Sequence, residues 1–180
     1  MSDRPSFFDD DDFDEEGAFD EPPAFFPDDI SSRGSGAPVP VRVEGLYGTE
    51  VSTKDNRSIV QRFVQLEDKD ERRLQVMIGP FEAMAISMAM EGAKPDRPLT
   101  HDLLKTFLDR LGAELDRVVI DDLWNGTYYA KVYLTFGDEE IEIDSRPSDA
   151  IALALRCHPD RPKLYVLESV FEAAEERPED

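Results

Sequence analysis

The sequence predicts an α+β fold made of two β-β-β-α units, in which two buried apolar helices pack on an antiparallel or mixed sheet. The main observation is a repeat: Pro80–Ile86 (PFEAMAI) returns 67 positions later as Pro147–Leu153 (PSDAIAL). Each copy follows an alternating apolar run and precedes the tetrapeptide Pro-Asp-Arg-Pro. A repeat of this length is a whole supersecondary unit, so we expect an internally duplicated domain.

Alternating apolar residues predict the strands of the first unit. They lie around Val41, Val43 and Leu46, over 58–67, and over 73–79. The charged turn 68–71 joins the last two into a hairpin. Pro80 then begins a helix over 80–91, because a proline at the first helical position removes an N–H that has no partner there.

A middle helix is predicted over 101–111, with Thr100 as its N-cap and Gly112 as its stop. The second unit then repeats the order of the first. Its elements are strands over 114–123, 127–136 and 139–144, a helix over 147–157, a short strand over 163–167 and a terminal helix over 168–174. Asn125-Gly126, between the first two of these strands, is the strongest hairpin signal in the chain.

Both repeat helices are apolar on nearly every face, over 83–90 in the first copy and 150–155 in the second. A helix without a polar face is typical of a protein core. We therefore expect both helices to be buried against the sheet or against each other.

The chain of 180 residues has a formal net charge of -21. Residues 1–36 alone carry 12 acidic and 2 basic side chains. The composition predicts a disordered, acidic and aromatic N-terminal tail over 1–38, a domain over 39–174, and an acidic C-terminal tail over 175–180. The N-terminal tail either keeps the protein in solution or, through its alternating acidic and aromatic residues, docks on a partner or mimics a phosphate backbone that carries bases.

Several features favour a cytoplasmic protein that does not associate with membranes. No apolar run approaches the roughly 18–20 residues that cross a bilayer, and no apolar signal core follows the N-terminus. The single cysteine, Cys157, cannot form an intramolecular disulfide and is interpreted as a small packing residue.

No strong catalytic or metal-binding motif is present, so the candidates are carboxylates, one histidine and one arginine. Glu82 and Asp149 occupy the same repeat position, the third residue of each helix. They either complement the positive end of the helix dipole or form a pair that acts as a general base or metal ligand. His101 is either a polar residue at a helix start or a proton-transfer group.

Glu140, Glu142 and Asp144 alternate with Ile141 and Ile143, which places three carboxylates on one face of a strand. This face is either exposed to solvent or binds a divalent cation, which would relieve the repulsion between the carboxylates.

Two further groups could contact a nucleic acid. Arg146 either contacts a phosphate at the start of the second repeat helix or pairs with Asp144 or Asp149. Aromatic residues around the Asn-Gly turn, namely Trp124, Tyr128 and Tyr129, either stack on bases or pack across strands.

Four segments closely resemble the bifunctional nuclease family, over about 39–174 of this chain. They are IGPFEA (78–83), RPLTHDLL (97–104), NGTYYA (125–130) and DSRPSDAIALA (144–154). The family takes its name from activity on both DNA and RNA. The resemblance implies an α+β domain that assembles as a homo-oligomer and has nucleic acid as its substrate.

Together these observations predict a nuclease without strong sequence specificity, assisted by Mg²⁺ or Mn²⁺. A metal would supply the positive charge that an acidic domain lacks for phosphate binding. The predicted roles are catalysis for Glu82, His101 and Asp149, metal binding for Glu142, Asp144 and Asp149, and substrate binding for Arg146 and Arg97. The alternative is a non-catalytic oligomeric scaffold that recruits partners through its acidic tail, in transcription or stress response.

Overall fold

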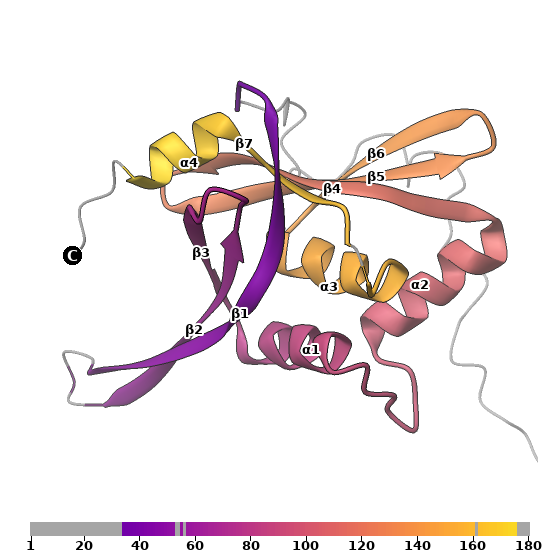
Figure 1. The fold of residues 1–180 in the computed structure, drawn as a ribbon. Helices are drawn as coiled ribbons and strands as arrows, with labels where there is room; N and C mark the ends of the chain where they lie inside the picture. Colours follow the sequence, from indigo (N-terminus) through magenta and orange to yellow (C-terminus); the bar gives the residue numbers. More distant parts are fainter. Residues whose placement is uncertain (1–33, 53–54, 56, 161, 176–180) are drawn as a thin grey trace, which may run out of the picture. The chain divides into compact units, whose positions relative to one another are not determined.

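The computed structural model describes residues 34–52, 55, 57–160 and 162–175. The N-terminal tail before residue 34 and residues 176–180 lie outside the described residues, and so do the predictions made for them. The elements, in chain order, are β1 (Pro38–Ser52), β2 (Ser58–Glu67), β3 (Arg73–Ile78), α1 (Pro80–Met90), α2 (Thr100–Leu111), β4 (Ala113–Trp124), β5 (Thr127–Phe136), β6 (Glu139–Ser145), α3 (Pro147–Cys157), β7 (Leu164–Leu167) and α4 (Glu168–Glu175) (Figure 1). The α+β fold is confirmed.

The strands form one mixed sheet with the order β3-β2-β1-β7-β4-β5-β6. Only the β4–β7 pair is parallel, and the other neighbours run antiparallel. The order is symmetric about β7, because β1, β2 and β3 lie on one side as β4, β5 and β6 lie on the other. A duplicated β-β-β-α unit would produce this order, although the duplication itself stays a prediction.

The local signals for turns and helix starts lie where the chain changes direction. Asn125 and Gly126 both have positive φ, 47° and 82°, which is the backbone of the two-residue hairpin that twisted antiparallel strands favour. Pro80 and Pro147 begin α1 and α3. Gly112 closes α2 in the left-handed region at φ 75°.

Helix α3 is the centre of the core. Eight of its residues are buried, and it packs against α1, α2, β4 and β5. Alternate β5 residues Ala130, Val132 and Leu134 face this core and are buried. Cys157, at the end of α3, packs against the core as expected, and burial raises the pKa of its thiol.

The prediction that the first repeat helix is buried is wrong. Only Ala85 and Ile86 of α1 are buried, while Phe81 is 77% exposed and Met84 47%. The reason is topological, because α1 packs on α3 and β2 along one side and no other described helix or strand covers its outer side (Figure 1). The apolar stripe of α2 is also largely exposed, since Leu108 is its one buried residue.

Candidate active site

The starts of α1 and α3 meet at Arg146, the residue that precedes α3. Its Nη1 lies 2.9 Å from Oε1 of Glu82 on α1. Its Nε donates a hydrogen bond to Oδ2 of Asp149 at 2.7 Å. The two carboxylates that the repeat made equivalent therefore share one guanidinium group, which brings the two predicted catalytic acids onto one surface.

His101, in the first turn of α2, joins the same group. Its Nε2 lies 3.0 Å from Oδ1 of Asp149, and the His101 side chain is only 12% exposed. Asp149 thus contacts the imidazole with one oxygen and Arg146 with the other. A carboxylate in this position orients an imidazole ring.

One local and one long-range contact, both to Asp102, fix the start of α2 and with it His101. The Leu99 N–H donates to Oδ2 of Asp102 at 2.9 Å, and Arg156 Nε on α3 donates to Oδ1 of the same carboxylate at 2.6 Å. Burial alone would raise the pKa of Asp102, but these two hydrogen bonds outweigh it and lower that pKa. Leu99 is therefore the N-cap, one residue before the predicted Thr100.

Glu82, His101, Arg146 and Asp149 border an open cavity of about 370 Å³ between α1, α2 and the start of α3. Apolar groups of Phe81, Met84 and Leu99 line it beside the polar group described above. A cavity of this kind, with few polar groups converging on one point, is the usual form of a ligand site.

The polar group carries more negative than positive charge. Glu82 and Asp149 are two carboxylates against one guanidinium, so the sum is negative when His101 is neutral. The hydrogen bond to Asp149 raises the pKa of Arg146 above its ordinary value, which keeps the cation charged. Arg146 remains 66% exposed, and the described contacts use only its Nε and Nη1.

The three predicted metal ligands do not come together. Glu142 and Asp144 lie opposite Tyr133 and Lys131 in the β5–β6 register, on the face of the sheet turned away from α3. Asp149 lies on the face that α3 covers. The alternation that put the carboxylates on one face of the strand is confirmed, but that face is not the one that carries Asp149.

Glu142 already has partners on its own face. It accepts a hydrogen bond from Nζ of Lys131, and this bond lowers the pKa of the Glu142 carboxyl. Tyr133 also donates to Glu142; burial and this hydrogen bond raise the pKa of Tyr133 to about 12. Throughout the part of the chain that the structure describes, no group of three or more His, Cys, Asp or Glu side chains is arranged to hold a metal ion.

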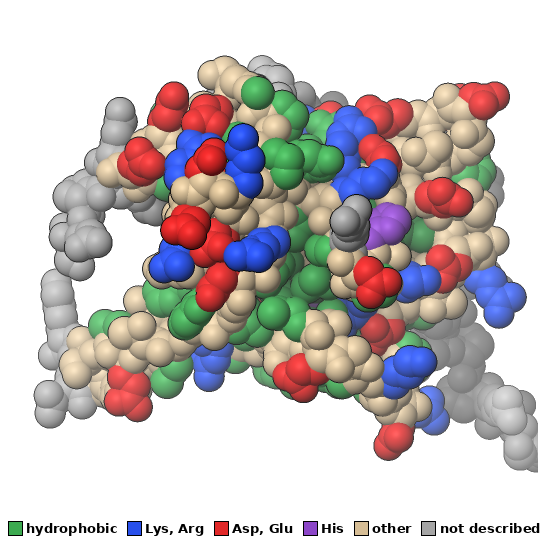
Figure 2. Space-filling model, viewed as in Figure 1, with side chains coloured by type: hydrophobic (Ala, Val, Ile, Leu, Met, Phe, Trp, Pro, Cys, Tyr) green, Lys and Arg blue, Asp and Glu red, His purple; other side chains and the backbone are tan. Residues whose placement is uncertain are grey.

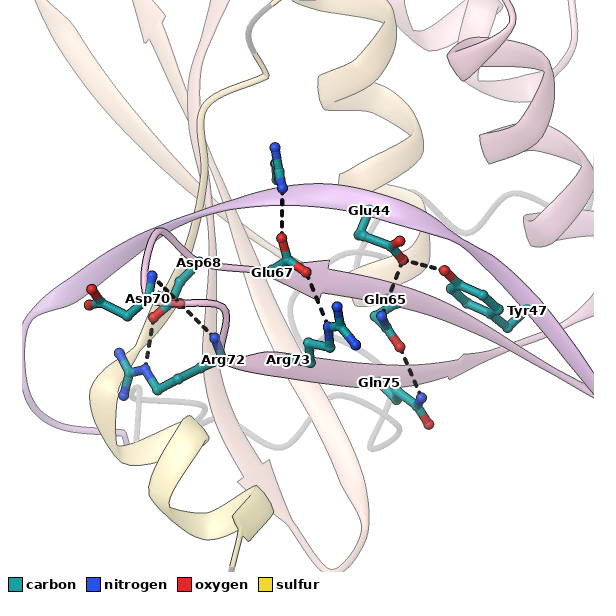
Figure 3. A network of polar contacts seen from close by, with 10 residues as sticks. Glu44, Tyr47, Gln65, Glu67, Asp68, Asp70, Arg72, Arg73 and Gln75 are labelled. Atoms are coloured by element: carbon teal, nitrogen blue, oxygen red, sulfur yellow. Dashed lines mark hydrogen bonds and ion pairs between the residues drawn. The ribbon is translucent and has the colours of Figure 1, made fainter.

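Two arginines that could supply positive charge for nucleic-acid binding are already paired with carboxylates. Arg73 Nε donates to Oε2 of Glu67 at 3.1 Å, and Arg72 Nε pairs with Oδ2 of Asp68 at 2.7 Å (Figure 3). Arg72 also pairs with Glu168 at 2.5 Å. Acidic and basic side chains are interspersed over the face seen in Figure 2. Arg97 lies exposed in the connection between α1 and α2 and does not line the cavity.

Two residues that support the site were missed from the sequence. Arg156 holds Asp102 from a position 54 residues away, and an arginine near the end of an apolar helix was the only signal. Gly79 lies under the Glu82 carboxylate: a Cβ at Gly79 would lie 2.3 Å from Glu82 Oε2. The signal was a glycine directly before the helix-starting proline.

Comparison with known proteins gives one family model and several relatives. The model described as the bifunctional nuclease domain matches residues 64–179. An uncharacterized protein of Mycobacterium tuberculosis, Rv1829, is 41% identical over 129 residues, which cover 72% of this chain and 73% of that protein.

Plant relatives match a shorter segment. Bifunctional nuclease 2 of Oryza sativa subsp. japonica is 32% identical over 97 residues, 52% of this chain and 30% of the rice protein. Bifunctional nuclease 2 of Arabidopsis thaliana is 29% identical over the same length, again 30% of that protein. The chain thus spans about a third of these plant proteins. Among its described helices, none is long and apolar enough to cross a membrane.

Proposed function

Because this chain belongs to the bifunctional nuclease domain family, we propose that it hydrolyses phosphodiester bonds of DNA and RNA without strong sequence preference. The reaction takes place at the cavity bordered by His101, Asp149, Arg146 and Glu82. The observation that supports this most directly is the 3.0 Å contact between His101 Nε2 and Asp149 Oδ1. This contact pairs the His101 imidazole, which can act as a general base, with the Asp149 carboxylate, which orients it.

In the proposed mechanism, Asp149 accepts the Nε2–H of His101 and so selects the tautomer in which Nδ1 carries the lone pair. The imidazole takes a proton from a water molecule, whose oxygen forms a new bond to phosphorus. The bond between phosphorus and the leaving sugar oxygen breaks, and that oxygen takes up a proton from solvent. Arg146 contacts a non-bridging phosphate oxygen and stabilises the charge on it.

Glu82 acts as a positioning residue in this mechanism. It holds Nη1 of Arg146 at 2.9 Å and so keeps the guanidinium beside the dyad. The carboxylates predicted as metal ligands do not fit a metal within one chain, so no step here uses one. Whether Mg²⁺ or Mn²⁺ assists cleavage is tested directly by adding EDTA.

The experiment incubates purified protein with a supercoiled plasmid and a structured RNA, with and without EDTA. We expect cleavage of both, and its loss on Asp149→Ala with folding retained. Cleavage that survives this substitution would sink the proposal. Cleavage that EDTA abolishes would add a metal, held by substrate phosphates or by ligands from more than one chain.

A second candidate, the oligomeric scaffold, is favoured by one specific observation. Seven large apolar side chains of α1 and α2 are exposed, each by more than 40%: Phe81, Met84, Met90, Leu103, Leu104, Phe107 and Leu111. Apolar side chains gather near the centre of the face in Figure 2. We propose that a second copy of the chain covers the α2 stripe, because exposed apolar patches of this kind mark interfaces. Phe107→Asp should then yield monomers in size-exclusion chromatography with light scattering; an unchanged mass would contradict it.

A further inference from the structure

A second open cavity, of about 400 Å³, lies next to the candidate active site. Its walls come from β2 and β3 on one side and from the Asn-Gly turn and β5 on the other, and the start of α3 closes it. Arg146 lines both this cavity and the one that contains His101. The two cavities therefore meet at the residue that the proposed mechanism assigns to the phosphate.

The lining of this second cavity suits a flat aromatic ligand with polar edges. Phe63 and Met77 are cross-strand partners on the face opposite the buried Val64 and Val76, and Tyr128 of β5 also lines the cavity. Met77 is 62% exposed, so its apolar side chain does not contribute to the core. Aromatic and apolar walls of this kind are the surfaces on which bases stack.

Polar groups lie at the edges of the same cavity. Gln75, Thr127 and Ser148 are the lining residues with polar side chains, and Nε2 of Gln75 donates to Oε1 of Gln65 at 3.0 Å. Gly79 and Gly126 also line the cavity. The volume falls within the range of about 300–1,000 Å³ that is usual for small-molecule sites. It is adequate for one base and its sugar, but a stacked and paired base would first have to leave its helix.

We propose that this cavity binds one unpaired nucleobase, next to the phosphate that Arg146 contacts. The inference rests on the proposed function for the identity of the ligand, and it specifies the substrate class as single-stranded or unpaired nucleic acid. Arg146 joins the two subsites, with the base on one side and the bond to be cleaved on the other. The base supplies the affinity that a negatively charged site cannot obtain from phosphate alone.

The test measures binding rather than cleavage. A short labelled single strand, as DNA and as RNA, is titrated by fluorescence anisotropy against protein that carries His101→Gln, and so is the same strand in a duplex. We expect tighter binding of the single strand. Phe63→Leu and Met77→Ala should each weaken it about fivefold or more, the lower end of a lost stacking contact, and leave duplex binding unchanged.

Matched controls are Phe136→Leu and Met90→Ala, which change the same residue types at exposed positions outside the cavity. Equal effects from cavity and control variants would overturn the inference, and so would equal affinity for single strand and duplex. Competition by an apolar peptide in place of a nucleotide would also overturn it. If the cavity variants have no effect on binding while cleavage still requires His101, the base site is refuted and the proposed nuclease activity is not. If the cavity variants weaken single-strand binding while cleavage does not require His101, the catalytic proposal alone is refuted.

Discussion

Gly79→Ala should change the position of Arg146 while leaving the stability of the fold nearly unchanged. A Cβ at this position would lie 2.3 Å from Oε2 of Glu82, where ordinary contact begins at 3.4 Å. The carboxylate, at the end of a flexible side chain, must therefore withdraw by about 1 Å. That movement takes Oε1 out of hydrogen-bonding reach of Arg146 Nη1, now 2.9 Å away.

The substitution costs little stability. Gly79 has φ -75° and ψ 168°, a conformation that alanine adopts freely, and the stiffer unfolded chain favours the variant by about 0.4–1 kcal/mol. Alanine is a poorer N-cap than glycine, which costs about 0.5–1 kcal/mol. The lost ion pair is worth about 0.5–1 kcal/mol, because Arg146 is 66% exposed and well screened. The net change in the free energy of unfolding should stay within about 1 kcal/mol.

Activity should fall much further. A misplacement of about 1 Å in a group that positions a substrate can cost on the order of 100-fold in rate. We therefore expect kcat/KM for a labelled oligonucleotide to fall about 10- to 100-fold, while the thermal midpoint moves by only a few degrees.

The control is a double-mutant cycle with Glu82→Ala. If Gly79 acts through the Glu82 carboxylate, adding Gly79→Ala to Glu82→Ala should cause no further loss. An equal loss in both backgrounds would refute this reasoning, as would a single Gly79→Ala variant with unchanged activity.

Three other changes test the supporting contacts. Asp149→Asn keeps the side-chain volume but removes the charge that orients His101. Cleavage should therefore fall about 10²- to 10⁴-fold in a rate assay, while circular dichroism should show that the fold persists. Full activity would contradict a catalytic role for the His101–Asp149 pair. Arg156→Met removes a partner of Asp102 that is only 7% exposed. The free energy of unfolding measured in urea should fall by about 2–3 kcal/mol. A loss of less than about 0.5 kcal/mol would count against the Arg156–Asp102 contact. Since the folded pKa of Tyr133 is raised to about 12, its stabilising effect is complete below pH ~10 and lost as the pH rises through about 12. The stability advantage of wild type over Tyr133→Phe should therefore shrink by about 1–2 kcal/mol between pH 9 and pH 12, and a constant difference would be inconsistent with the shift.

The parts of this fold that depend on local chemistry could be predicted from the sequence. Proline at two helix starts, Asn125-Gly126 in a hairpin and Gly112 at a helix end each act through the backbone of one or two residues. A shared surface was one of the two interpretations that the repeat allowed for Glu82 and Asp149, the other being helix-start electrostatics. Both carboxylates contact Arg146, because equivalent positions in two similar units become neighbours when the helices pack side by side.

Long-range placement could not be predicted in the same way. The alternation of Glu142 and Asp144 with isoleucine was correct, but strand periodicity does not say which face a later helix will cover. Composition likewise gave no means to distinguish α3, which packs against α1, α2 and the sheet, from α1, which has an exposed side. The Arg156–Asp102 contact joins residues 54 apart, and neither residue alone signals the other.

The most direct test of a nuclease whose active site is the cavity between α1, α2 and the start of α3 uses the two histidines of the chain. His101 borders the cavity, whereas His158 Nε2 contacts the carbonyl oxygen of Leu115 at 2.7 Å, outside it. The measurement is the rate of single-strand cleavage by His101→Gln and His158→Gln, each purified in the same way as wild type. We expect a loss of at least about 100-fold for His101→Gln and near wild-type cleavage for His158→Gln. Equal rates for the two variants would contradict this expectation.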